Sequence, residues 1–299
     1  LMSESIDLTS MYKIPTVIIY VQRAGPSTGM PTKTEQADLN AALYQGHGDA
    51  PRIVLAPANV QDCFYLTIKA FNLSERCQMP AIVLSEQSLS DRVEVIDKPD
   101  LSRTKIENRL KPNYDEIAKS GVFKRYAITK DGISPMSIPG EKHGIYIAES
   151  LEREESSKFS YEPDTHELMM QKRIRKLKKV EDEPNMTRVF NPGENEAKVG
   201  VISWGPSEGA ITEAVAKANK KGKKASSMHI LMLSPLPVRQ IQPFLEHVKN
   251  IVVPELNQTG HLANLLTETL VVNTIPLRKT TGLPFTTDEI FNKIMEVAD

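Results

Sequence analysis

The sequence predicts an α/β protein made of two blocks in which strands alternate with helices. The first observation is that three short apolar runs, at 14–21, 51–57 and 80–85, lie close to the N-terminus. Uninterrupted apolar runs are typical of strands buried on both faces. The second observation is that strand-like and helix-like segments alternate again from residue 199 onward. This alternation indicates parallel sheets joined by right-handed crossovers.

In the first block, the three strands are separated by a polar loop and a helix. The loop runs from Arg23 to about Thr34 and is rich in glycine and proline. The helix begins at Asn59 or Gln61 and ends at Gln78, because apolar side chains recur there at helical spacing. These apolar positions are Cys63, Phe64, Ile68, Phe71 and Leu73.

The second block has the pattern of a small doubly wound domain. Gly222 follows its first helix, as glycine often does at a helix C-terminus. Thr286 and Glu289 have the spacing of a capping box before its last helix. The expected elements are strand 199–203, helix 207–221, strand 228–233, helix 238–248, strand 250–254, helix 260–269, strand 271–277 and helix 288–298.

Between the two blocks, residues 92–198 contain seven prolines and few periodic segments. A segment of this length without regular structure is usually functional or a linker. A helix is expected from Asp164 to Lys179, with Asp164 and Glu167 as a capping box. Its end, Lys172–Lys179, carries six cations in eight residues. We expect a solvated helix end that the macrodipole favours, with a surface for a partner or a nucleotide phosphate as the alternative.

Composition excludes several classes of protein. The net charge of −1 gives no basic surface for nucleic acid, and no apolar run approaches the length of a membrane span. No secretory signal pattern is visible, and the two cysteines fit a reducing compartment, so we expect a cytoplasmic protein. The chain opens with Leu1 inside an amphipathic pattern, so we expect either an incomplete gene product or processing of a longer chain.

The segment QRAGPSTGMPTKTEQADL, residues 22–39, is the most informative part of the sequence. It follows a buried strand, at the edge where open α/β sheets bind their ligands. It carries two cations and several hydroxyls, which a structural turn does not require. Arg23 offers a planar fork for a carboxylate. We therefore expect a site for an anionic substrate or cofactor, with a solvent-exposed connection as the alternative.

This segment resembles the corresponding loop in the α subunits of 2-oxoacid:ferredoxin oxidoreductases, in particular the 2-oxoglutarate type, also called 2-oxoglutarate synthase. The resemblance continues almost to the end of the chain. One departure is Pro254-Glu255-Leu256-Asn257, where the family often has Glu-Asn-Asn. The further similar segments are 43–64, 79–90, 125–140, 161–177, 199–211 and 282–290.

The resemblance implies a heteromeric enzyme that oxidatively decarboxylates a 2-oxoacid and transfers the acyl group to coenzyme A. It implies thiamine diphosphate and Mg²⁺ bound between this subunit and a β subunit, which also carries a [4Fe–4S] cluster. Ferredoxin would accept the electrons, and a γ-type domain or subunit would complete the complex. Neither nucleic acid nor a membrane is expected as a partner.

The resemblance also implies a division of the chain. Residues 1–95 would be part of a pyrimidine-binding domain that is doubly wound and lacks its first strands. Residues 96–197 would be an irregular linker with a basic helix. Residues 198–299 would be an α/β domain similar to the C-terminal domain of transketolases. Because the missing strands would cover the run 14–21, we expect that run to form an exposed apolar edge.

Site residues carry over from the family by position. Arg23, Ser27 and Thr28 would bind the substrate. Gln22, Gly25 and His47 would face the cofactor cleft. No metal ligand is expected in this chain, and no certain catalytic residue, because the family's activating glutamate lies before the loop.

Two other functions stay open. Gly205–Gly209 is a formal G-x-S-x-G motif, so a serine hydrolase using Ser207 is possible on paper, although a tight turn with Ser207 as N-cap explains the motif more simply. A non-catalytic scaffold subunit is the second. Within the resemblance, the substrate is 2-oxoglutarate, pyruvate or a branched-chain 2-oxoacid.

Overall fold

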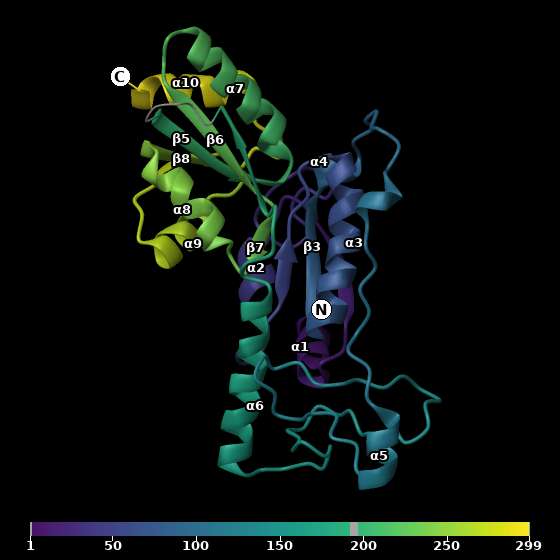
Figure 1. Cartoon of the computed structure of the whole chain (residues 1–299). Helices are drawn as coiled ribbons and strands as arrows, with labels where there is room; N and C mark the ends of the chain where they lie inside the picture. Colours follow the sequence, from purple (N-terminus) through teal and green to yellow (C-terminus); the bar gives the residue numbers. More distant parts are fainter. Residues whose placement is uncertain (1, 192–196, 299) are drawn as a thin grey trace.

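The computed structural model describes residues 2–191 and 197–298, and it contains two β-sheets with helices packed on their faces (Figure 1). The predicted α/β class is confirmed. The domain boundaries at 95/96 and 197/198 stay a prediction. Within the residues that the structure describes, no helix combines the length and apolar character needed to cross a bilayer.

The first sheet has four strands in the order β1-β3-β2-β7. The first three are parallel, and they are the strands that the apolar runs predicted. The bounds are β1 Thr16–Gln22, β2 Ile53–Leu55, β3 Pro80–Glu86 and β7 Met232–Ser234. β1 is the edge strand, and Ile19 on it is 57% exposed, as expected for an uncovered apolar edge.

The second sheet has five strands in the order β4-β6-β5-β8-β9. All are parallel except β4, which the sequence did not predict because it lies in the irregular segment. The bounds are β4 Thr187–Phe190, β5 Ala197–Trp204, β6 Ala225–Ile230, β8 Val248–Glu255 and β9 Ile275–Arg278.

Helices cover both sheets on both faces. In the second sheet, α7 and α10 pack on one face and α8 and α9 on the other, which is a doubly wound arrangement (Figure 1). The α-helices are α1 Ser3–Tyr12, α2 Leu39–Tyr44, α3 Val60–Cys77, α4 Gln87–Ser90, α5 Tyr114–Ser120, α6 Pro163–Arg175, α7 Glu208–Lys220, α8 Val238–Glu246, α9 His261–Leu270 and α10 Thr287–Ala298. In the described part of the chain, the 3₁₀ turns are Leu101–Arg103, Lys176–Lys179 and Gly205–Ser207.

The two sheets share one core. The expected strand 228–233 is in fact two strands: β6 stays in the second sheet, whereas β7 pairs antiparallel with β2 of the first. One continuous apolar cluster then joins Val54 and Ile82 of the first sheet to Ile202 and Phe244 of the second block. This pairing spans more than half of the chain, so the local pattern could not reveal it.

The last helix begins as predicted. Thr286 N donates to Glu289 Oε2 (2.7 Å), and Glu289 N donates to Thr286 Oγ1 (3.3 Å). This reciprocal pair is the capping box expected from the sequence. The box forms because both partners lie within one turn of chain.

The helix expected at 164–179 differs from its prediction in two ways. It begins at Pro163 after Glu162, without a side-chain cap bond, so the predicted capping box is wrong. It also changes to a 3₁₀ turn after Arg175. Proline fits the first helical turn because its missing N–H would have no partner there.

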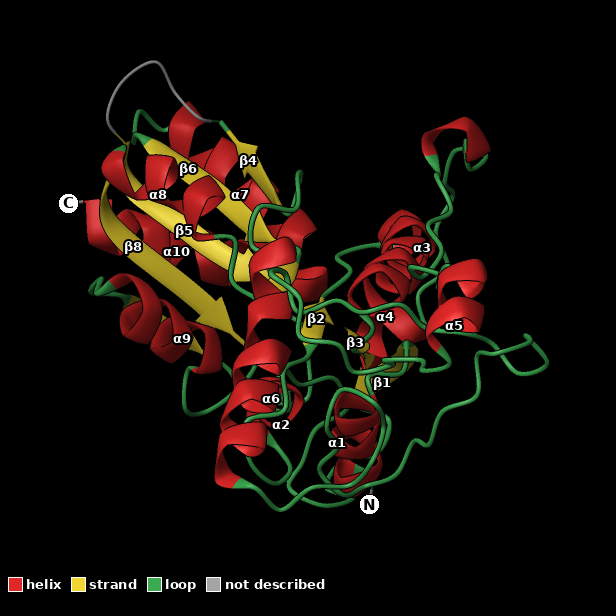
Figure 2. Ribbon diagram, turned by 60° about the horizontal axis from the view of Figure 1, so that its bottom comes forward, coloured by secondary structure: helices red, strands yellow, loops and turns green. Residues whose placement is uncertain are grey.

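The expectation of a solvated basic helix end is wrong for three of its six cations, whereas Lys178 and Lys179 are exposed as expected. Lys172, Arg173 and Lys176 are buried, whereas Ile174 between them is exposed. Lys172 Nζ donates to the carbonyl of Gly132 (2.7 Å), and Lys176 Nζ donates to that of Gln78 (2.8 Å). The cause is tertiary: Gly132 lies in the long connection between α4 and α6, mostly loops in Figure 2, and Gln78 lies in the turn between α3 and β3, so segments far from α6 in the sequence bring their carbonyls against it.

Candidate functional site

The polar loop between β1 and α2 lies at the carboxyl edge of the first sheet, as predicted. We call residues 23–38 the Arg23 loop. Gln22, which is buried, links the end of this loop to β3: Gln22 Nε2 donates to the carbonyl of Ser85 (3.2 Å), and Asp38 N donates to Gln22 Oε1 (3.0 Å). Open α/β sheets bind ligands at this edge.

Further bonds fix the inside of the Arg23 loop. Glu35 Oε2 accepts from the N–H of Gly25 (2.9 Å), and Met30 N donates to the carbonyl of Ala24 (2.9 Å). Gly29 has φ +46°, and a Cβ there would lie 2.3 Å from that same carbonyl oxygen. Only glycine fits this position. The loop is therefore a defined structure and not a loose connection.

The site residues expected in this region fall into two groups. Arg23, Ser27 and Thr28 are exposed, and within the described ranges no hydrogen bond or ion pair engages the Arg23 guanidinium. Gln22 and Gly25 have partners inside the protein instead. The first group is free to meet a ligand, whereas the second supports the loop.

The far end of the Arg23 loop is held by the second sheet through Gln36, which is fully buried. Its Nε2 donates to the carbonyl of Trp204 at the end of β5 (2.9 Å). Its backbone N–H donates to the carbonyl of Leu256 (2.7 Å), and Leu256 N donates to Gln36 Oε1 (3.1 Å). The carboxyl edges of both sheets therefore meet at this loop.

The segment that departs from the family pattern contributes to this contact. Asn257 Nδ2 donates to the carbonyl of Gln36 (3.0 Å). The carboxylate of Glu255 accepts from the backbone N–H groups of Leu262 (2.7 Å) and Ala263 (3.1 Å), at the start of α9. An anion at a helix N-terminus is favourable. Glu255 and Asn257 therefore help to hold the Arg23 loop and α9 in place, although this segment departs from the Glu-Asn-Asn that the family often has.

Three titratable side chains interact at the end of the loop: Tyr20, Asp38 and His261. Tyr20 hydrogen-bonds Asp38, and burial together with that carboxylate raises the pKa of Tyr20 to about 12. Burial raises the pKa of Asp38. Burial also lowers the pKa of His261, and the nearby carboxylates of Glu255 and Asp38 partly offset this lowering. Sequence reasoning missed this group because its members come from β1, the loop and α9.

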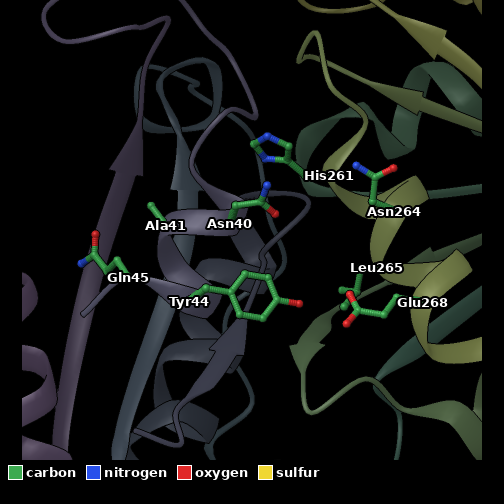
Figure 3. A pocket seen from close by; sticks show the side chains of 8 residues that line it. All are labelled: Asn40, Ala41, Tyr44, Gln45, His261, Asn264, Leu265 and Glu268. Carbon is green, nitrogen blue, oxygen red and sulfur yellow. The ribbon is translucent and has the colours of Figure 1, made fainter. Parts of the chain in front are cut away.

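A pocket of about 480 Å³ lies between α2 and α9, beside this group (Figure 3). Tyr44 of α2 faces Glu268 of α9 across it, and the charge of Glu268 contributes to raising the pKa of Tyr44, after burial. Asn40 and His261 lie at one end. Helices this far apart in the sequence carry no local signal that they would share a pocket.

His47 lies elsewhere. It precedes β2, so it stands at the amino edge of the first sheet, opposite the Arg23 loop. Its N–H donates to Asp7 Oδ2 (2.7 Å), and its exposed ring lies 3.7 Å from Glu4 Oε2. The structure therefore does not bring His47 together with Arg23. Its position before a strand, and not after one, was a signal that could have indicated this.

Ser207 has no catalytic partner. Its Oγ is buried and makes no hydrogen bond to another described residue. It occupies the position before α7, but its side chain forms no cap bond, so the N-cap expectation is met in position only. A serine nucleophile needs a base within hydrogen-bond reach. The geometry therefore gives no support to a serine hydrolase.

The structure shows two free cysteines, Cys63 and Cys77, both in α3. Burial raises the pKa of each thiol. Among residues 2–191 and 197–298, no group of three or more His, Cys, Asp or Glu side chains is arranged to hold a metal ion. That this chain supplies no metal ligand stays a prediction.

Residues 1–172, more than half of the chain, match the family described as "Pyruvate flavodoxin/ferredoxin oxidoreductase, thiamine diP-bdg". The chain belongs to this family. Residues 197–276 match "Pyruvate:ferredoxin oxidoreductase core domain II". The resemblance seen in the Arg23 loop is confirmed.

Curated relatives agree along the whole chain. It is 33% identical to "2-oxoacid:ferredoxin oxidoreductase 2, subunit alpha" of Aeropyrum pernix, covering 100% of this chain and 46% of the relative. It is 36% identical to "2-oxoglutarate oxidoreductase subunit KorA" of Mycobacterium tuberculosis, covering 97% of this chain and 43% of the relative. It is 30% identical to "2-oxoglutarate synthase subunit KorA" of Methanothermobacter marburgensis, covering 99% of this chain and 77% of the relative.

A solved structure is also similar. It is described as "2-oxoglutarate:ferredoxin oxidoreductase from Magnetococcus marinus with 2-oxoglutarate, coenzyme A and succinyl-CoA bound". The TM-score is 0.94 at 38% identity, covering 100% of this chain and 51% of that one. The chain thus spans about half the length of this protein and of the first two relatives.

Proposed function

We propose that the chain acts within the α subunit of an enzyme that converts 2-oxoglutarate and coenzyme A into succinyl-CoA and CO₂, with ferredoxin as electron acceptor. The observation that carries this proposal is the free guanidinium of Arg23 on a loop fixed by both sheets. The names of two relatives and the ligands of the Magnetococcus marinus structure support 2-oxoglutarate as the substrate class.

Arg23 would bind a carboxylate of the 2-oxoacid. Its planar fork can donate two parallel hydrogen bonds, which an ammonium cannot reproduce. The exposed hydroxyls of Ser27 and Thr28 lie in the same loop and can donate to the remaining substrate oxygens. Since Gln22, Glu35 and Gln36 fix the loop, these donors are positioned before the substrate arrives.

Thiamine diphosphate would supply the stabilisation of negative charge that decarboxylation of a 2-oxoacid requires. The Arg23 loop fits one wall of such a site, because its polar side chains are exposed at the carboxyl edge and its backbone is rigid. We assign the Mg²⁺, the diphosphate contacts and a [4Fe–4S] cluster to a β subunit. A γ-type domain or subunit would complete the complex, and we place that complex in the cytoplasm.

The test is reconstitution of the complex with its other subunits and an assay with three oxoacids. We expect coenzyme A-dependent reduction of ferredoxin with 2-oxoglutarate, and a much lower kcat/KM with pyruvate and with a branched-chain 2-oxoacid. Preference for either of those two would overturn the substrate assignment. Absence of turnover with all three would overturn the proposed function.

A further inference from the structure

Glu86 stands beside the Arg23 loop and has an incomplete set of partners. It is the last residue of β3 and pairs in register with Gln22, the residue before Arg23. Its side chain is 1% exposed. The hydroxyl of Ser88 donates to Glu86 Oε1 (2.9 Å), whereas Oε2 has no hydrogen-bond partner among the described residues. A carboxyl group of this kind is costly to bury in its charged form.

The elements packed around Glu86 do not neutralise it. In the ranges that the structure describes, no ion pair joins this carboxyl to a lysine, arginine or histidine. Burial without a cation raises the pKa of Glu86 to about 7, although hydrogen bonds from Ser88 and Thr34 lower it in part. The charged groups on the neighbouring elements are Arg23, Lys33, Glu35 and Asp38 in the loop, Asp91 and Arg92 after α4, Glu208 at the start of α7 and Glu255 at the end of β8.

Those charged groups have other roles. Arg23 and Lys33 are exposed, Glu35 accepts from Gly25 N, Asp38 hydrogen-bonds Tyr20, and Arg92 pairs with Glu94. Asp91 accepts from Gln87, Glu208 pairs with Arg188, and Glu255 accepts from the first N–H groups of α9. None of these groups forms an ion pair or hydrogen bond with Glu86 Oε2 in the described residues, so burial alone decides against a negative charge there. Glu86 therefore avoids an unpaired buried charge by keeping its proton.

Glu86 also lies where three parts of the molecule meet. Thr34 of the loop hydrogen-bonds its carboxyl and also accepts from the N–H of Ser88 (3.5 Å). A Cβ on Gly205, in the turn after β5, would lie 3.8 Å from Glu86 Oε2. The carboxyl is thus enclosed by β3, the Arg23 loop and the second sheet. A charge placed there can be hydrated only if one of these parts moves.

We propose that Glu86 is a positioning residue for the 2-oxoacid site: in its protonated form it holds the Arg23 loop against both sheets, and loss of the proton loosens the loop and displaces Arg23. The loop is the part that moves, because its outer half is exposed whereas β3 and β5 are buried. The effect on substrate binding rests on the proposed function, but the loosening of the loop does not.

The loosening can be measured on the full chain by amide hydrogen exchange of residues 23–36, after correction for the intrinsic rate at each pH. At about pH 8.5, a group with a pKa near 7 has roughly thirty ionised copies for each protonated one. We expect protection of the loop to fall by about tenfold or more between about pH 6 and about pH 8.5. In Glu86→Gln, a neutral side chain of the same shape, protection should be equal at both pH values.

Two further variants test this interpretation, one by shifting the pH of the transition and the other as a control. Ser88→Ala removes a hydrogen bond that favours the carboxylate, so the loosening should shift to higher pH. Glu4→Gln changes an exposed carboxyl at the opposite edge and should behave like the wild type. Equal loss of protection in the wild type and in Glu86→Gln would overturn the role of Glu86. If Glu86→Gln does not fold, the test is the pH at which half of the loop protection is lost in Ser88→Ala. If that pH equals the wild-type value, the role of Glu86 is overturned.

The second readout is the KM for the 2-oxoacid in the reconstituted complex. We expect KM to rise about tenfold between about pH 6 and about pH 8.5, with a smaller change in kcat, and to stay level in Glu86→Gln. Matching KM profiles in the two proteins, with normal turnover, would overturn the link to Arg23. A complex that turns over no 2-oxoacid would instead refute the proposed function, while the exchange experiment still decides on Glu86.

Discussion

Gln36 Nε2 donates a hydrogen bond to the carbonyl oxygen of Trp204 at 2.9 Å, although 168 residues separate them in the chain. Together with the bonds between Gln36 and Leu256, this contact joins the Arg23 loop to the carboxyl edge of the second sheet. The loop that carries the proposed substrate ligand is therefore shaped by both halves of the chain.

Gln36→Ala should destabilise the protein. The change leaves the carbonyl of Trp204 and the N–H of Leu256 buried without partners, and each lost partner costs about 1–3 kcal/mol. We expect the free energy of unfolding in urea to fall by roughly 2–4 kcal/mol. Gln171→Ala, on the exposed face of α6, is the matched control and should change it by less than about 0.5 kcal/mol. Equal stabilities of the two variants would contradict a stabilising role for the contact of Gln36 with Trp204 and Leu256.

Arg23→Lys should weaken use of the 2-oxoacid in the reconstituted complex. An ammonium keeps the charge but loses the two-pronged geometry, so kcat/KM should fall by the equivalent of roughly 1.5–3 kcal/mol. Arg239→Lys is the control, because Arg239 is an exposed arginine that pairs with Asp182 on the surface. Steady-state kinetics identical in both variants would remove Arg23 from the substrate site.

The buried lysines should make stability depend on pH. Burial lowers the pKa of Lys172 to about 7, and Lys176 and Lys13 shift in the same direction. Between about pH 7 and about pH 10 the unfolded chain binds a proton at Lys172 that the folded chain does not, so stability should rise with pH. The slope for one such lysine is at most about 1.4 kcal/mol per pH unit.

Urea unfolding of Lys172→Met between about pH 7 and about pH 9 measures this contribution. The variant should show a smaller slope than the wild type. Lys178→Met changes an exposed lysine in the 3₁₀ turn that follows α6, and this variant should keep the wild-type slope. A slope that does not change in Lys172→Met would show that this lysine stays charged in the folded state.

Arg188 should be important for the joining of α3 to α7. Its guanidinium pairs with Asp62 (2.6 Å) and with Glu208 (2.8 Å), and both carboxylates are largely buried. Arg188→Met leaves two like charges facing each other, so we expect a loss of roughly 3–5 kcal/mol. Asp62→Asn in the same background should restore part of it, as thermal unfolding can measure. No recovery in the double variant would contradict a charge-based cause.

The sequence alone determined the features that depend on neighbours along the chain. Apolar runs identified β1, β2 and β3. The strands β2 and β3 are buried on both faces, which requires apolar side chains at consecutive positions, whereas β1 carries a similar pattern as a partly exposed edge strand. Thr286 and Glu289 identified the start of α10, because both partners of a capping box lie within one turn. The motif at 22–39 identified the family, because its residues are contiguous.

Only the tertiary structure decided which distant segments meet. β7 joins the first sheet, Lys172 turns inward to a carbonyl of Gly132, and His47 faces the edge opposite Arg23. Each outcome depends on which surface a segment covers, and burial is set by packing between parts far apart in sequence. A charged or polar side chain has the same local pattern whether water or a backbone carbonyl solvates it, so the sequence could not distinguish the two.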